Sequence, residues 1–266
     1  MNISDLVMAH VASNSDVTIM ADFLMFFAAA GISIAAFSNR FLFGNRNMDS
    51  DALFETVEKS IFAFLVFLLA ITLGDVRANF SKAQDSVINE SLELRQYLFL
   101  LDLQPNAFTQ HQKKQLERYV KAVVADEWIS LAQANPLLSG EAERAVVDMR
   151  KSAQKNVQES GMSSYSDKIL TSLGKLENAR ILRYQLATAS SPRVFWLYIA
   201  ILMLLGSVMA GRAKLDGRRA GVLGAYFGAL GMVVGLIMIM DQPFRGETSI
   251  SSEPFRMVIE QMNAAR

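Results

Sequence analysis

Four apolar segments constrain the fold of this chain more than any other feature. They cover residues 17–38, 52–74, 194–211 and 220–240, and a helix needs about 20 residues to cross the hydrocarbon core of a bilayer. Backbone groups in lipid are satisfied only within helices or closed barrels, and none of these segments alternates every second residue as a barrel strand does. The sequence therefore predicts an all-α protein with four transmembrane helices.

A polar stretch separates the second span from the third, and its apolar residues recur at helical spacing. Phe80, Val87, Leu94 and Leu101 repeat every seven residues. Span two is therefore expected to continue outward as one helix to about Leu101, roughly 75 Å in all.

The predicted organisation is a helical extramembrane domain inserted between spans two and three. Breaks rich in proline and glycine separate further helices, expected over about 109–131, 141–159 and 165–188, with Thr109 as the N-cap of the first. The boundaries are an N-terminal tail at 1–16, spans one and two at 17–74, the extramembrane domain at 75–193, spans three and four at 194–240, and a C-terminal tail at 241–266.

Composition excludes several classes of function. The 266-residue chain has no cysteine, which rules out disulfides, thiolate catalysis and cysteine-based metal sites. Its two histidines, His10 and His111, lack the spacing of a histidine metal site, and its formal net charge of zero implies no general attraction to nucleic acid. Neither a nucleophile paired with a base nor a phosphate-binding motif is recognisable. We therefore expect no metal, no cofactor, no nucleic-acid partner and no enzymatic activity.

Basic residues in the short loops set the expected orientation, because such loops face the cytoplasm. The loop after span one carries Arg40 and Arg46. The loop after span three carries Arg212, Lys214, Arg218 and Arg219. The tail that precedes span one has no Lys or Arg. The prediction is a multi-pass membrane protein with both termini and the helical domain outside the cytoplasm, which in the inner membrane of a bacterium means the periplasm.

Span four carries glycines on one face of its helix. They stand three and four residues apart, at Gly221, Gly224, Gly228, Gly231 and Gly235. Such a face lets a second backbone approach closely, which drives helix association in lipid. The partner helix belongs either to the same subunit or to the next one, and the sequence leaves both interpretations open.

Four acidic residues are expected at a similar depth near the outer face. Asp22 lies in span one, Asp75 ends span two, Asp241 ends span four and Glu247 lies just beyond it. An ionisable side chain in a span is costly and marks an ion pathway by default. In the alternative interpretation, Asp22 stays hydrated near the interface, and Asp75 and Asp241 cap helix ends or pair with arginines.

A second charged group stands near the inner mouth of span two. If this span lines a pore, Glu55 and Glu58 form a charged ring at one end and Asp75 a ring at the other. The alternative is an interfacial cluster that anchors the span, in which Glu55 and Lys59 form an ion pair within one helix.

In the extramembrane domain, Glu127 and Trp128 stand out beside a second acid, Asp126. An acidic pair next to Trp suits either a bound cation or an ion pair with Arg180 or Arg183. The structural interpretation is favoured, with Glu127 as an ion-pair partner and Trp128 as a packing anchor.

The order of short motifs along the chain resembles a known bacterial membrane family. The motif residues are Glu90, Tyr119, Glu127, Trp128, Arg183, Asp241, Pro243, Phe244, Gly246, Glu253 and Pro254. The Glu-Trp pair and the Asp-x-Pro-Phe-x-Gly exit of span four are the most specific marks. Over nearly the whole chain this order is similar to the family described as a bestrophin-like domain. The resemblance implies a distant likeness to bestrophins, which are homo-pentameric anion channels with a pore along the second span and most of their mass in the cytosol.

Taken together, these features predict a homo-oligomeric ion channel with a pore lined by span two. The expected pore or pathway residues are Asp22, Glu55, Glu58, Asp75 and Asp241. The expected partners are membrane lipid, further copies of the chain and inorganic ions. The alternative is a membrane-anchored scaffold or sensor, whose helical domain binds a partner protein or an envelope component without conducting ions.

Overall fold

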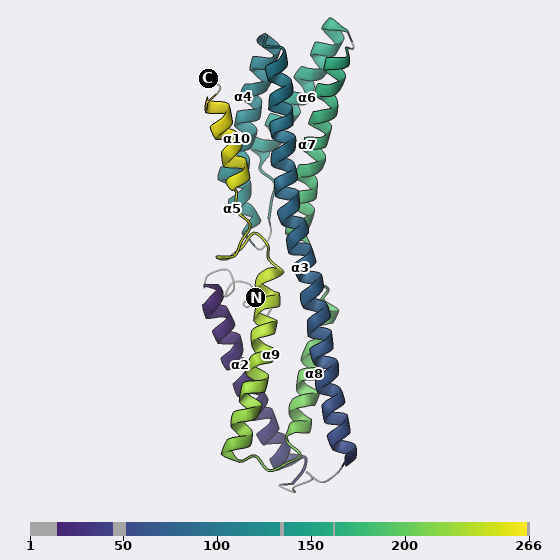
Figure 1. The fold of residues 1–266 in the computed structure, drawn as a ribbon, viewed down its shortest axis with the longest axis vertical. Coiled ribbons are helices and arrows are strands. Elements are labelled where there is room, and N and C mark those ends of the chain that lie inside the picture. Colours follow the sequence, from purple (N-terminus) through teal and green to yellow (C-terminus); the bar gives the residue numbers. More distant parts are fainter. Residues whose placement is uncertain (1–14, 45–51, 134–135, 162, 265–266) are drawn as a thin grey trace. The chain divides into compact units, whose positions relative to one another are not determined.

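The computed structural model describes residues 15–44, 52–133, 136–161 and 163–264, and every element in these ranges is a helix (Figure 1). The elements are α2 (Asp16–Phe41), α3 (Ala52–Leu103), α4 (Ala107–Ala122), the π-helix η1 (Val123–Glu127), α5 (Trp128–Leu131), α6 (Gly140–Ser160), α7 (Ser164–Thr188), α8 (Arg193–Ala210), α9 (Gly217–Met240) and α10 (Glu253–Ala264). The predicted all-α class is confirmed. Most of the predicted N-terminal tail, with His10, lies outside the described residues, as do Arg46 and the side chain of Arg193.

The chain divides into two compact units. Unit 1 comprises Met1–Asn79 and Ser190–Gln242, and unit 2 comprises Phe80–Ala189 and Pro243–Arg266. Helix α3 contributes its first part to unit 1 and its second part to unit 2. With 52 residues it is about 78 Å long, so the predicted continuation of span two as one helix is confirmed.

Three of the described helices are long and apolar enough to cross a membrane, namely α2, α3 and α9. Helix α8 is apolar over Val194–Ala210 but falls below that length. A four-span arrangement therefore depends on α8 and stays a prediction.

In unit 1, α2 and α9 run side by side and approach closely where α9 has glycine (Figure 1). A Cβ atom added at Gly231 would lie 2.5 Å from the Phe23 carbonyl oxygen, and one at Gly228 would lie 3.2 Å from Leu24 Cγ. The glycines that face α2 are Gly224, Gly228, Gly231 and Gly235. A Cβ at Gly221 would meet nothing within 4 Å. The partner helix of these four glycines thus belongs to the same chain.

The connection between α8 and α9 is fixed to the end of α2. The Asn39 amide donates to the carbonyl oxygens of Gly211 at 2.8 Å and Ala213 at 3.0 Å. A side chain at Gly211 would collide with the backbone of Ala35, so glycine is required for this approach. These contacts bring the end of α2 and the α8–α9 connection to one end of unit 1.

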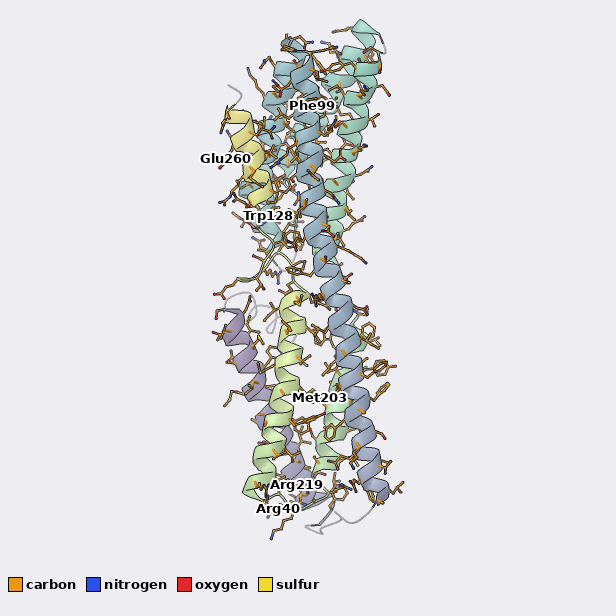
Figure 2. All side chains as sticks on the ribbon, viewed as in Figure 1. Arg40, Phe99, Trp128, Met203, Arg219 and Glu260 are labelled. Carbon is orange, nitrogen blue, oxygen red and sulfur yellow. The ribbon has the colours of Figure 1, made fainter. Side chains whose placement is uncertain are left out.

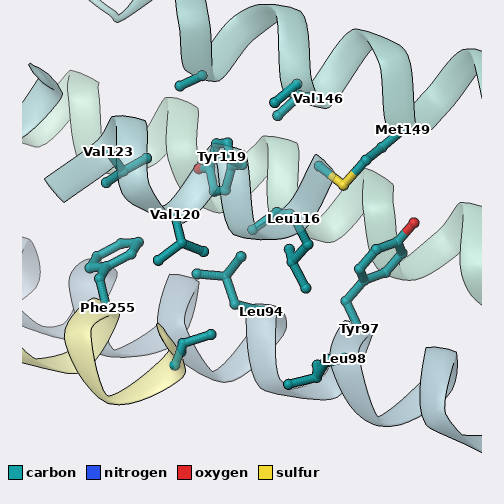
Figure 3. Close-up of a cluster of buried hydrophobic side chains, with 14 of the residues drawn as sticks. Leu94, Tyr97, Leu98, Leu116, Tyr119, Val120, Val123, Val146, Met149 and Phe255 are labelled. Carbon is teal, nitrogen blue, oxygen red and sulfur yellow. The ribbon is translucent and has the colours of Figure 1, made fainter. Parts of the chain in front are cut away.

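Unit 2 buries its apolar side chains between helices that are distant in sequence (Figure 3). The labelled side chains come from α3 (Leu94, Tyr97, Leu98), α4 and η1 (Leu116, Tyr119, Val120, Val123), α6 (Val146, Met149) and α10 (Phe255). Of the residues with seven-residue spacing in α3, Val87, Leu94 and Leu101 are buried and Phe80 is partly buried. The periodicity in the sequence therefore marks the face of α3 that meets this core.

The N-cap of α4 lies three residues earlier than the sequence predicts. Asn106 is the N-cap: its side chain accepts from the Thr109 amide at 2.9 Å, and the Thr109 hydroxyl accepts from the Asn106 amide at 2.9 Å. This reciprocal arrangement is a capping box. The prediction of Thr109 as the cap is wrong because Thr also serves at the third helical position, where its hydroxyl bonds back to the cap.

The sequence pattern predicts a tail over 241–266, whereas the structure forms α10 there and packs it into unit 2. Phe255, Val258 and Met262 are buried and define the apolar face of this helix. Pro254 lies in its first turn, where the missing proline N–H costs no hydrogen bond.

Candidate functional site: a buried charge network and an uncovered helix face

Unit 2 encloses a network of charged and polar side chains from four helical elements. Glu90 lies on α3, Tyr119 on α4, Glu127 in η1, and Arg180 and Arg183 on α7. Arg180 is 4% exposed and the other four are 0% exposed. Carboxylates and guanidinium groups are almost never fully buried unless they are paired, so their partners decide whether such an arrangement is stable.

Arg183 lies between the two carboxylates. Its Nε donates to Glu90 Oε2 at 2.7 Å, and its Nη2 donates to Glu127 Oε2 at 2.7 Å. Arg180 Nη2 donates to Glu127 Oε1 at 2.5 Å, and the Tyr119 hydroxyl donates to Glu90 Oε1 at 2.5 Å. Two buried negative charges are thus matched by two buried positive charges.

The segment before α6 closes one side of the network. The Ser139 amide donates to Glu127 Oε1 at 3.0 Å, and the Ser139 carbonyl accepts from Arg180 Nη2 at 3.3 Å. Arg180 also donates to Glu143 in the first turn of α6. The same side chains therefore fix the start of α6 to α7 and η1.

A π-helical turn presents Glu127 to the arginines. The Trp128 amide donates to the Val123 carbonyl, five residues back, and both Val123 and Glu127 are buried. One extra residue in the turn changes the direction of the following side chains, and such turns are frequent at functional sites. Nothing in the amino-acid pattern predicts this turn.

The pairing sets the charge state of the network. Burial by itself raises the pKa of Glu127, but the guanidinium groups of Arg183 and Arg180 outweigh it and hold that pKa below its usual value. Burial likewise opposes the charge on Arg183, yet the nearby Glu90 carboxylate leaves its pKa raised. Burial, together with the Glu90 charge, raises the pKa of Tyr119. At neutral pH the carboxylate of Glu127 is therefore ionised and Tyr119 is a neutral donor.

Aromatic side chains cover the network on the side of the C-terminal segment. The Arg183 guanidinium lies 5.6 Å from the ring centroids of Trp128 and Phe255. Trp128 also contacts Phe244 edge-on, at 5.4 Å between centroids, and its Nε1 donates to the Ile250 carbonyl at 3.2 Å. A cation over aromatic faces is favourable, and more so where water is excluded.

The other motif residues of the C-terminal segment shape the turn that leads into α10. The Pro243 carbonyl accepts from the Ile250 amide at 2.8 Å. Gly246 has φ 77°, a conformation that favours glycine. Glu253 is exposed at the start of α10, followed by Pro254. This turn brings Phe244 and Phe255 into the core of unit 2.

The arrangement is suited to holding helices in register. Both carboxylates are occupied by donors, and in the described part of the chain no group of three or more His, Cys, Asp or Glu side chains could hold a metal ion. Removing one partner from a buried ion pair is strongly destabilising, because it leaves an uncompensated charge. The network therefore makes the packing of α3, η1 and α7 mutually dependent.

In unit 1, the acids expected along an ion pathway have different partners and do not form one cluster. Asp241 accepts from the Ser191 amide at 3.0 Å and from its hydroxyl at 2.7 Å. Glu58 forms an ion pair with Arg212 at 2.9 Å, with side chains only 15% and 5% exposed. Both acids are thus engaged by residues of the same chain.

The remaining pathway candidates are more open. Glu55 accepts from Lys59 at 2.6 Å, and both side chains are exposed. The two residues stand four apart in the sequence, a separation that favours an ion pair within one helix. Asp22 and Asp75 are exposed on α2 and α3.

Reasoning from the sequence missed Ser139, Ser191 and Phe255. The two serines stand just before helices, where a local capping role is the ordinary expectation, so their contacts with distant carboxylates have no local signal. Phe255 did have a local signal, because the apolar residues at 255, 258 and 262 have the spacing of an amphipathic helix.

One face of α3 is left uncovered by the residues that the structure describes. In unit 1 it exposes Ala63, Phe67, Ala70, Gly74 and Ala78, at the spacing of a single helical stripe. In unit 2 the stripe continues through Ser81, Asp85, Ile88, Leu92, Phe99 and Leu103. Leu92, Phe99 and Leu103 are each more than half exposed. Exposed apolar side chains that gather on one helix face, as Leu92, Phe99 and Leu103 do, mark a candidate interaction surface.

Comparison with known proteins gives a family and a fold. The family model described as "Bestrophin-like domain" matches residues 25–255. Two solved variants of a bacterial bestrophin homologue from Klebsiella pneumoniae are similar at 11% identity, with TM-scores of 0.68 and 0.67. These comparisons cover 94% and 91% of this chain and 98% of each of those chains.

A solved structure described as a membrane protein is similar with a TM-score of 0.64 at 12% identity, over 91% of this chain and 97% of that one. No match was found among curated proteins. At such low identity the likeness shows the fold.

Proposed function

This chain belongs to the Bestrophin-like domain family, and from that premise we propose that it is a homo-oligomeric ion channel whose pore is lined by α3. The observation that carries the proposal is the uncovered face of α3, which runs from the apolar part of the helix into unit 2. A helix that lines a pore keeps one face away from its own chain, and copies arranged around an axis close the channel.

The exposed acids of this helix are the first candidates for contact with ions. Asp75 follows the apolar part of α3, and Asp85 lies on the uncovered face in unit 2. Rings of carboxylates in an oligomer select ions by their charge. Glu58 and Asp241 are weaker candidates because Arg212 and Ser191 already engage them. Glu55 and Asp22 stay in the proposal as charges near the ends of the spans.

The proposed topology has four spans, with α8 as the third, in a bacterial inner membrane. The basic loops favour unit 2 and both termini in the periplasm, whereas the likeness to bestrophins favours unit 2 in the cytosol. The absence of cysteine makes this testable with single introduced cysteines. Lys155→Cys in unit 2 should react with a membrane-impermeant maleimide in intact spheroplasts, and Lys214→Cys should react only after lysis. The reverse pattern would establish the bestrophin-like orientation.

Conductance of purified protein in planar bilayers tests the channel. We expect discrete currents whose reversal potential in a salt gradient shifts when Asp75→Asn and Asp85→Asn are combined. Glu159→Gln is the matched control, since Glu159 is an exposed carboxylate on α6 that pairs with Lys155. Silent bilayers from protein that is folded and oligomeric would overturn the proposal.

The alternative is a membrane-anchored scaffold or sensor. The apolar side chains of α3 that unit 2 exposes favour it, because a partner protein would cover them as well as a second copy would. Crosslinking at an introduced Leu92→Cys separates the two. Chain-to-chain crosslinks support the oligomer, and crosslinks to another protein in cells, with no self-crosslink, support the scaffold.

A further inference from the structure

One end of unit 1 gathers basic side chains from two helix ends. Arg40 lies in the last turn of α2, Lys214 in the α8–α9 connection, and Arg218 and Arg219 in the first turn of α9. The hydrogen bonds of Asn39 hold these segments together. Figure 2 shows Arg40 and Arg219 at this same end. These four residues are here named the basic end.

The acidic side chains that the structure describes near this end each have a partner. Glu58 pairs with Arg212, Glu55 pairs with Lys59, and Asp216 accepts from the Arg219 amide at 2.8 Å as the N-cap of α9. Arg40, Lys214 and Arg218 are exposed, and in the part of the chain that the structure describes no carboxylate pairs with them. The basic end therefore presents positive charge to an outside ligand.

Exposed apolar side chains surround these charges. Phe37 and Phe41 are 59% and 65% exposed on α2, with ring centroids 4.5 Å apart, next to Arg40. Leu42 follows them, and Val222, one turn beyond Arg218, is 65% exposed. A free phosphate or a nucleic acid would engage the charges and leave these side chains in water. A phospholipid satisfies both, because its phosphate meets the cations and its acyl chains cover the apolar side chains.

We propose that the basic end of unit 1 binds the headgroups of anionic phospholipids. The helices that carry it, α2 and α9, are both long and apolar enough to lie in a membrane, so the basic residues stand where an apolar helix face ends. The inference rests on the membrane location in the proposed function and is independent of ion conduction.

Titration of the detergent-purified protein with lipid, followed by native mass spectrometry, tests it. Phosphatidylglycerol should bind more tightly than phosphatidylcholine. The double variant Lys214→Gln/Arg218→Gln should weaken phosphatidylglycerol binding roughly 25-fold, since each basic side chain near an anionic surface contributes roughly fivefold. Phosphatidylcholine binding should not change. The matched control is Lys155→Gln/Lys175→Gln, which removes two exposed charges from unit 2 and should leave both affinities unchanged.

Further measurements distinguish a failure of the proposed lipid site from a failure of the proposed membrane location. Equal binding of phosphatidylglycerol by the wild type and the double variant would overturn the inference, as would displacement of the lipid by inorganic phosphate at an equal concentration. Unchanged circular dichroism melting shows that the variant is folded. Flotation with liposomes tests the membrane location alone: a wild type that fails to float counts against the proposed function, and one that floats without a preference for phosphatidylglycerol counts against the basic end.

Discussion

The two units of this chain hold their helices together by different means. In unit 1, α2 and α9 meet over glycines that let a side chain of one helix touch the backbone of the other. In unit 2, α3, η1 and α7 meet around two buried carboxylates and two buried guanidinium groups. The first contact is made of short-range dispersion between apolar surfaces, and the second of charge-assisted hydrogen bonds.

The difference fits the proposed location of unit 1 in lipid and of unit 2 in water. Lipid tails are as apolar as a leucine side chain, so the hydrophobic effect does not drive helices together in a membrane. Van der Waals packing across a close approach over small residues supplies the attraction instead. In water, apolar burial already drives the helices of a bundle together. A desolvated ion pair then adds specificity, because a helix that is misplaced leaves a charge without its partner.

The largest expected effect comes from breaking the network in unit 2. Arg183→Met leaves Glu90 and Glu127 buried without their shared cation, and should lower the free energy of unfolding by about 3–5 kcal/mol. Trp128 reports on this unit when Trp196 is replaced by Phe, so chemical denaturation followed by fluorescence measures the change.

The control for that variant is Arg150→Met. Arg150 donates to Glu177 on the surface of unit 2, with its side chain 39% exposed, and its removal should cost less than about 1 kcal/mol. Equal effects of the two substitutions would show that the buried pairs do not govern the stability of unit 2.

A smaller effect is expected from the glycine contact of unit 1. The Cβ of Gly231→Ala would lie 2.5 Å from the Phe23 carbonyl oxygen and 2.8 Å from Phe27 Cβ, so α2 and α9 have to move apart. Overpacking of this kind costs about 1–3 kcal/mol. Thermal unfolding in detergent, followed by the fluorescence of Trp196 in a Trp128→Phe background, measures it.

Gly221→Ala is the matched control on the same helix. Its Cβ meets nothing within 4 Å, so stability should be unchanged or slightly raised, because Ala favours a helix over Gly. If both variants lose stability equally, the close approach of α2 and α9 is not what holds them together.

Acid should weaken unit 2 through the same ion pairs. The pKa of Glu127 is lower when folded than its usual 4.5, so the stability that its charge contributes is fully present above that value and is lost as pH falls through the folded pKa. Denaturation midpoints measured at descending pH should therefore fall more steeply in the wild type than in Glu127→Gln. Parallel profiles would indicate that other carboxylates carry the acid sensitivity.

The smallest effect is expected where the C-terminal segment meets Trp128. Trp128→Phe keeps an aromatic ring beside Phe244 and Phe255 but removes the donor to the Ile250 carbonyl. The loss should be about 0.5–1.5 kcal/mol, read from circular dichroism melting. Trp196→Phe is the comparison, since it removes the other Trp from α8. A loss of several kcal/mol in Trp128→Phe alone would show that the ring itself, through Arg183, supports the network.

Much of the fold follows from local pattern. The seven-residue spacing of Val87, Leu94 and Leu101 predicts both the continuity of α3 and its buried face. Residues three, four or seven apart in a helix lie on the same face. The start of α4 was misplaced because Asn106 and Thr109 are both capping residues, and only the geometry of their reciprocal bonds assigns the roles. Helix α10 escaped prediction because Pro254 lies near its start, although the apolar spacing from Phe255 onward marks it.

What the sequence determined by itself is where the helices and apolar segments lie and which face of each is apolar or small, since these depend on residues within a few turns of one another. The tertiary structure decided the partners. It placed the glycines of α9 against α2 of the same chain, and it joined Glu90 to Arg183 across 93 residues of sequence. A buried charge is stable only when an opposite charge arrives from another helix, and an approach over glycine is close only if the facing backbone is there. Both conditions are set by distances between elements, on which the local pattern carries no information.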